Sequence, residues 1–94
     1  MDIDALYQII CDRRDQPAEQ SYTASLLAQG EDRILQKIGE ESVEIILAAK
    51  GQGSARLTEE VADLTYHVLV MLAYYHLTPD DIRAELARRH RPAS

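Results

Sequence analysis

Two pairs of acidic residues in this sequence have a spacing that suits metal-ion chemistry. Glu41 and Glu44 stand three residues apart in the stretch KIGEESVEIILAAK, and Glu60 and Asp63 do so in LTEEVADLTYHVLVML. Residues three apart lie on the same side of a helix, where like charges repel each other. This repulsion predicts a cation opposite the carboxylates, whose oxygens are ligands that suit Mg²⁺ or Mn²⁺.

Two long helices are predicted to carry these acidic pairs. Apolar residues recur every three or four positions over 31–50 and over 54–76, which is typical of amphipathic helices. The connection GQGSA is short, so the helices should pack antiparallel with their acidic edges facing each other. Four carboxylates in a partly desolvated cleft need cations or raised pKa values, so the pattern predicts a metal site.

The acidic residues also allow interpretations other than a metal site. A single ExxE is more often a solvated helix face, but two such pairs flanking the core stripes of neighbouring helices favour function. A di-iron carboxylate bundle needs Glu-x-x-His pairs, and no histidine in this sequence stands three residues after a glutamate. His67 could be a ligand, although a histidine among Leu64, Val68 and Met71 is more often a core residue.

The remaining segments predict an all-α fold. No run of alternating apolar and polar residues is bounded by turn signals, so strands have little support. A single domain over 1–94 is expected to form a bundle of about four to five helices, ordered over about 3–86 and followed by a basic C-terminal tail. The other predicted helices cover 2–14, one or two turns before Gly30, and 79–90.

The helix over 54–76 is predicted to need cover on several sides. Its main apolar stripe consists of Leu57, Val61, Leu64, Val68, Leu72 and Tyr75. Leu69, Val70 and Ala73 lie on the far side, and one small chain can hardly cover both faces. The core is therefore expected to be completed by homodimerisation, with Val70 at the interface. Tyr66, Tyr74 and Tyr75 are expected in the core or the interface.

Composition excludes several classes of protein. The net charge of −6 and the pI near 4.9 argue against nucleic-acid binding, which needs a basic face. The most apolar run, 64–75, is shorter than the roughly 20 residues of a membrane helix. Cys11 is the lone cysteine and the N-terminus does not resemble a signal peptide, so a cytoplasmic protein is expected.

The acidic motifs resemble those of a known group of enzymes. KIGEESVE followed by EEVADLTYHVLVML resembles the signature of the all-α, MazG-type nucleoside triphosphate pyrophosphohydrolases. Together with SYTASLLAQG, these stretches resemble the phosphoribosyl-ATP pyrophosphohydrolase family over roughly 3–86. The resemblance implies Mg²⁺-dependent hydrolysis of phosphoribosyl-ATP to phosphoribosyl-AMP and pyrophosphate, the second step of histidine biosynthesis, in a helical homodimer.

The resemblance also implies roles for individual residues. Glu40 would orient a ligand or a water, and our own hypothesis for the mechanism is that Glu41 or Glu44 accepts a proton from the attacking water. Lys37 would meet the substrate phosphates, unless it only forms an ion pair with Glu41. The implied metal ligands are Glu41, Glu44, Glu60 and Asp63, and the other implied phosphate contacts are Ser21, Tyr22, Thr23, Arg33 and Lys50.

Two alternatives to this function stay open at the level of sequence. A housecleaning pyrophosphatase for general or damaged nucleoside triphosphates would share the metal site but not the substrate. A non-catalytic helical dimerisation module would carry the same acidic edges only for solubility.

Overall fold

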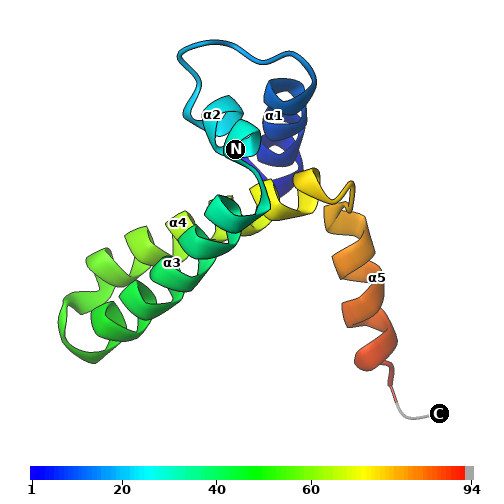
Figure 1. Cartoon of the computed structure of the whole chain (residues 1–94). Coiled ribbons are helices and arrows are strands. Elements are labelled where there is room, and N and C mark those ends of the chain that lie inside the picture. Colours follow the sequence, from blue (N-terminus) through cyan, green and yellow to red (C-terminus); the bar gives the residue numbers. More distant parts are fainter. Residues whose placement is uncertain (93–94) are drawn as a thin grey trace.

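The computed structural model describes residues 1–92, and within them the fold is all-α, as predicted (Figure 1). The ends of the two long helices lie within two residues of the predicted ends. The last two residues of the predicted tail, 93 and 94, lie outside the described residues. The five helices are α1 (Ile3–Asp15), α2 (Tyr22–Gln29), α3 (Glu31–Gly51), α4 (Gly53–Tyr74) and α5 (Pro79–Arg89).

Side-chain caps determine where three of the helices begin. The carboxylate of Asp2 accepts a hydrogen bond from the Ala5 amide at 2.7 Å at the start of α1. The hydroxyl of Ser21 accepts one from the Ala24 amide at 3.1 Å at the start of α2. At α5, Thr78 and Asp81 form a reciprocal capping box in front of a proline in the first turn. Each cap satisfies amides that the helix itself leaves without partners.

The helices α3 and α4 form a long antiparallel hairpin (Figure 1). Only Gln52 separates them, and the chain reverses there because Gly53 adopts a φ of +86°, which strains any residue with a Cβ. Gly30, with a φ of +91°, makes the equivalent break between α2 and α3. The hairpin places the middle of α3 opposite the N-terminal half of α4, which carry the two acidic pairs.

The hydrophobic core lies at one end of this hairpin. There, α1 and α2 cover the beginning of α3 and the C-terminal half of α4 (Figure 1). Arg14 of α1 donates to the Ala73 carbonyl at 2.7 Å, and Tyr7 donates to the Leu77 carbonyl at 2.5 Å, so α1 also caps the end of α4. The core cluster consists of Ile10, Cys11, Leu26, Ile34, Leu69, Val70, Leu72 and Ala73.

The prediction for the far side of α4 is wrong, and the main apolar stripe is less buried than expected. Val70, expected at a dimer interface, is 0% exposed, and Leu69 and Ala73 are buried beside it within the chain. The short helices α1 and α2 supply this cover, which helix periodicity alone does not reveal. The expected core stripe is instead partly open, because Val61 is 44% exposed and Leu64 and Val68 line an apolar groove of about 340 Å³ between α4 and α5.

The chain is more extended than its length suggests. Its radius of gyration is 15.1 Å, whereas a compact domain of this length has about 12 Å. In Figure 1 the α3–α4 hairpin and α5 diverge from the core as two arms. Arg83 of α5 holds the base of its arm to α1 by donating to Asp4 at 2.9 and 2.8 Å. Within residues 1–92 no helix is long and apolar enough to cross a membrane.

The position of Val70 predicts the effect of a charge there. Val70→Asp should lower the free energy of unfolding by several kcal/mol, because it places an unpaired carboxylate in the core. Urea denaturation followed by circular dichroism measures the loss. Ala84→Asp, at an exposed position of α5, is the control and should change stability by about 0.5 kcal/mol or less. Equal stability of Val70→Asp and wild type would contradict this description of the core.

Candidate active site

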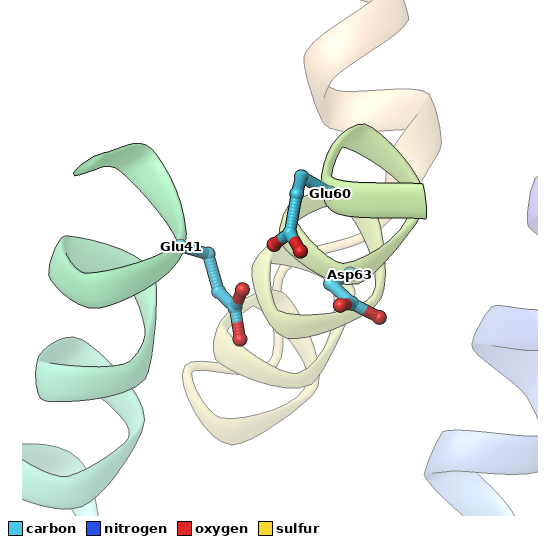
Figure 2. Close-up of side chains that lie close together, drawn as sticks. All are labelled: Glu41, Glu60 and Asp63. Atoms are coloured by element: carbon cyan, nitrogen blue, oxygen red, sulfur yellow. The ribbon is translucent and has the colours of Figure 1, made fainter. Parts of the chain in front are cut away.

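Three carboxylates meet between α3 and α4. Glu41 follows Ile34 and Ile38 on the side of α3 that faces the hairpin partner, so its side chain points toward α4 (Figure 2). Glu60 and Asp63 lie one turn apart on α4, and Figure 2 shows the Glu60 carboxylate on the side toward Glu41 and the Asp63 carboxylate beside it, pointing away from α3. One carboxylate oxygen from each residue lies within 4.8 Å of the others. The hairpin therefore brings together one member of the first acidic pair and both members of the second.

Burial makes this cluster electrostatically costly. Glu41 is 8% exposed and Glu60 is 3% exposed, while Asp63 is open to solvent. Burial raises the pKa of Glu60, and the charges of Asp63, Glu44 and Glu41 raise it further, whereas the nearby Arg56 guanidinium lowers it in part. The net shift is upward, so the protein stabilises the charged form of Glu60 incompletely.

Two basic side chains partly compensate the cluster. Lys37 Nζ lies 3.7 Å from Glu41 Oε1, one turn earlier on α3. Arg56 lies one turn before Glu60 on α4, and one of its terminal nitrogens lies 2.5 Å from Glu60 Oε1. In the described part of the chain, Asp63 has no ion-pair partner of its own. Two cations thus face three carboxylates, which leaves one negative charge uncompensated.

The donor set fits a divalent metal ion. Three carboxylates on two packed helices offer hard oxygen ligands, and two of them are buried enough for a bound cation to stabilise them strongly. Helices hold such ligands more firmly than loops do. Glu41, Glu60 and Asp63 can therefore hold a metal ion at the middle of the hairpin.

His67 connects the cluster to α2. It is buried one turn after Asp63, where its Nδ1 lies 2.8 Å from the Asp63 carbonyl oxygen and 3.7 Å from Glu41 Oε1. A carbonyl can only accept, so Nδ1 carries a hydrogen and Nε2 can accept from the Tyr22 hydroxyl 3.2 Å away. The neighbouring Thr23 hydroxyl bonds to the hydroxyl of Tyr66. These bonds attach the start of α2 to α4 beside the carboxylates.

The three adjacent hydroxyls predicted to contact phosphates have structural partners here. Ser21 caps α2 and keeps its own O–H available to donate. Tyr22 bonds to His67 and Thr23 to Tyr66, so a phosphate would have to displace these bonds.

The other predicted site residues lie farther from the cluster. Glu44 is exposed and outside the group of three, although its charge acts on Glu60 and on Arg56. Glu40 is exposed and lies 3.7 Å from Arg33 in an ion pair along α3. Lys50 stands in the last turn of α3.

Arg56 was not identified from the sequence. The signal was present, because an arginine four residues before a glutamate lies on the same side of a helix. Arginines in such positions are common, and only the burial of Glu60 distinguishes this pair from an ordinary surface pair.

Comparison with known proteins agrees with the geometry. A family model described as phosphoribosyl-ATP pyrophosphohydrolase matches residues 3–90. The chain belongs to this family. The match includes both acidic helices and the SYTASLLAQG segment, so the resemblance to MazG-type enzymes is confirmed.

Relatives of the family align over nearly the whole chain. A phosphoribosyl-ATP pyrophosphatase of Pelotomaculum thermopropionicum is 54% identical over 89 residues, which cover 95% of this chain and 91% of the relative. Proteins of the same name from Limosilactobacillus fermentum and Geotalea daltonii are 49% and 48% identical. These two alignments cover 94% and 93% of this chain, and 83% and 82% of the relatives.

The raised pKa of Glu60 predicts a pH-dependent stability in metal-free buffer. The folded protein holds the proton of Glu60 more tightly than the unfolded chain does, so this contribution to stability is present at low pH and is lost as pH rises above the ordinary value of 4.5. Glu60→Gln does not lose this contribution, because the side chain of glutamine stays uncharged at every pH of the measurement. With EDTA present, the melting temperature of Glu60→Gln minus that of wild type should therefore increase as pH rises above 4.5.

The exposed Glu44 supplies the matched control for this measurement. Glu44→Gln removes the same charge from the same hairpin without the burial, so its difference from wild type should change less with pH. If the two glutamine variants show the same pH dependence, burial of Glu60 is not the cause.

Proposed function

We propose that this chain hydrolyses phosphoribosyl-ATP to phosphoribosyl-AMP and pyrophosphate, the second step of histidine biosynthesis. The observation that carries the proposal is the convergence of Glu41, Glu60 and Asp63 in a chain of this family. Relatives at 48–54% identity bear the name of this activity. A cytoplasmic location is part of the proposal and is supported by Cys11, a buried free thiol in a chain that has no second cysteine.

Mg²⁺ is the proposed cofactor, with Mn²⁺ as a substitute. Glu41, Glu60 and Asp63 would hold it, and Glu44 would be the further ligand on α3 if its side chain turns inward. When bound, such an ion neutralises phosphate charge and lowers the pKa of a coordinated water. Among the donor types that this chain places together, carboxylates favour Mg²⁺ over softer metals.

The chain's own residues supply the remaining requirements of phosphoanhydride hydrolysis. Glu41 is well placed to accept the proton of the attacking water, because its carboxylate faces the cluster and its ion-pair contacts within residues 1–92, to Lys37 and His67, are both as long as 3.7 Å. Lys37 is the proposed phosphate contact nearest to the carboxylates, with its ammonium acting as a point charge. Glu40 and Arg33 pair on the exposed side of α3, where they can orient groups at the edge of the site.

The proposed activity predicts a specific pattern of turnover. Wild type should release pyrophosphate from phosphoribosyl-ATP in the presence of Mg²⁺ and far more slowly from dUTP, dCTP or ATP. Glu41→Gln should reduce kcat by about 10²-fold or more, since a general base contributes on the order of 10²–10⁴-fold. Coupled detection of pyrophosphate measures all of these rates.

Two results would contradict the proposed activity and favour another function. Faster turnover of dUTP or dCTP than of phosphoribosyl-ATP would indicate a housecleaning pyrophosphatase with the same metal site. Absence of Mg²⁺-dependent pyrophosphate release from every substrate would favour a non-catalytic helical module. Glu40→Gln is the control for Glu41→Gln, because Glu40 lies one position away and is exposed, and its effect should be smaller.

The proposed enzyme is a homodimer that assembles through the groove between α4 and α5. The groove is lined by apolar side chains on three elements, including Ile3, Val61, Ile82 and Leu86. These four side chains are each 44% or more exposed in the single chain, so burying them against a second copy would stabilise the assembly. The large radius of gyration supports a second copy of this chain as the partner that fills the groove. The single chain is extended, and a compact dimer would result if an extended helix of each chain packed into the groove of the other.

A charge in the groove should separate the two copies without unfolding them. Ile82 is 44% exposed in the single chain, so Ile82→Asp should be tolerated by the fold but should produce a monomer at micromolar concentration. Light scattering gives the mass, and circular dichroism reports the helix content. Ala87→Asp, on α5 outside the groove lining, should stay dimeric. A wild type that is monomeric, or an Ile82→Asp variant that stays dimeric, would contradict this interface.

A further inference from the structure

The ion pair between Arg56 and Glu60 differs from the other arginine ion pairs within residues 1–92. Its distance is 2.5 Å, and it joins a half-exposed guanidinium to the most buried carboxylate of the cluster. The other arginine pairs involve carboxylates that are 45% or more exposed, such as Glu85 and Asp4. Arg56 therefore neutralises a charge that solvent cannot reach, whereas the others lie on the surface.

A second carboxylate holds the guanidinium at the edge of the site. Another terminal nitrogen of Arg56 donates to Glu59 Oε2 at 2.8 Å, and the Glu59 side chain is 63% exposed. Arg56 thus bridges one buried and one exposed acid. If its bond to Glu60 is released, its bond to Glu59 can keep the guanidinium next to the cluster.

The charge balance of the cluster makes Arg56 a competitor of a bound cation. Glu60 can be neutralised by Arg56 or by a divalent ion, and two positive groups within a few ångströms of each other repel. A guanidinium displaced from Glu60 would carry free donors in a planar fork that matches phosphate oxygens. The phosphates of a substrate would lie against the same ion.

We propose that Arg56 is an exchangeable cation of the site: it neutralises Glu60 in the metal-free protein and moves to the phosphates of the substrate when a divalent ion takes its place. The inference rests on the proposed function, because it assumes a metal ion and a phosphate ligand at this cluster. It adds a phosphate-binding residue on α4, opposite Lys37 on α3, so that a positive side chain approaches the phosphates from each helix of the hairpin.

The first test measures metal binding in the absence of substrate. Mn²⁺ titrated into the full chain by calorimetry should bind Arg56→Gln about three- to tenfold more tightly than wild type, since the competing charge is gone. Arg56→Lys keeps the charge and should bind Mn²⁺ much as wild type does. An unchanged or weaker Mn²⁺ affinity in Arg56→Gln would overturn the exchange and would indicate that Arg56 only orients Glu60.

The second test measures phosphate binding with inorganic pyrophosphate as the probe. In saturating Mg²⁺, Arg56→Gln should bind pyrophosphate about tenfold more weakly, and Arg56→Lys should recover only part of the loss, because an ammonium lacks the paired donors of a guanidinium. Equal pyrophosphate affinity of wild type and Arg56→Gln would overturn the phosphate contact. Arg88→Gln, which removes the same charge from a surface pair on α5, should leave both affinities unchanged.

These outcomes separate this inference from the proposed function. If wild type itself binds neither Mn²⁺ nor pyrophosphate, the metal site and the proposed hydrolysis both fail. If wild type binds both and Arg56→Gln behaves identically, only the role of Arg56 fails. Circular dichroism of each variant verifies that it is folded before binding is measured.

Discussion

The repulsion among three carboxylates between α3 and α4 is the constraint to which the rest of the structure responds. Two of the three are buried, where each charge lacks most of its hydration. Lys37 and Arg56 replace part of the stabilisation that water would give these charges, yet the pKa of Glu60 stays raised. A hairpin with such a centre is stable only if its helices are held together elsewhere.

The core provides that stabilisation at one end of the hairpin. The helices α1 and α2 bury Ile34 and the C-terminal half of α4, and Arg14 and Tyr7 bond to carbonyls at the end of α4. The bond from Tyr22 to His67 then extends this rigid end up to the carboxylates. Apolar burial and electrostatic repulsion are thus separated along one pair of helices, which lets the site keep its charges close together while the chain remains folded.

The sequence predicted those features that depend on residues close together in the chain, and it did not predict those that depend on distant segments. Helix limits depend on neighbours in the chain, and the caps at Asp2 and Thr78 with the glycine after Gln52 were sufficient to place the starts of α1 and α5 and the break between α3 and α4. Helix period and a short connection predicted that four carboxylates converge, and the structure groups three of them, Glu41, Glu60 and Asp63, without Glu44. Which face of α4 is buried did not follow, because Val70 is covered by α1 and α2, whose packing direction depends on the loop between them.

The carboxylates of the cluster and the residues around them also differ in how far the sequence predicts their roles. A pair of carboxylates can be recognised in the sequence by residue type and spacing. The role of Arg56 cannot, because it depends on the burial of Glu60, and α3 causes that burial. The hydroxyls of Tyr22 and Thr23 show the converse, since their types suggested phosphate contacts while the fold occupies both with α4. A polar side chain beside a charged cluster can therefore be assigned to substrate or to scaffold only when its partners in the fold are known. Arg56 also has partners in the fold, but it has two of them, so its proposed exchange from Glu60 to a phosphate would still leave the bond to Glu59, whereas Tyr22 would lose its bond to His67.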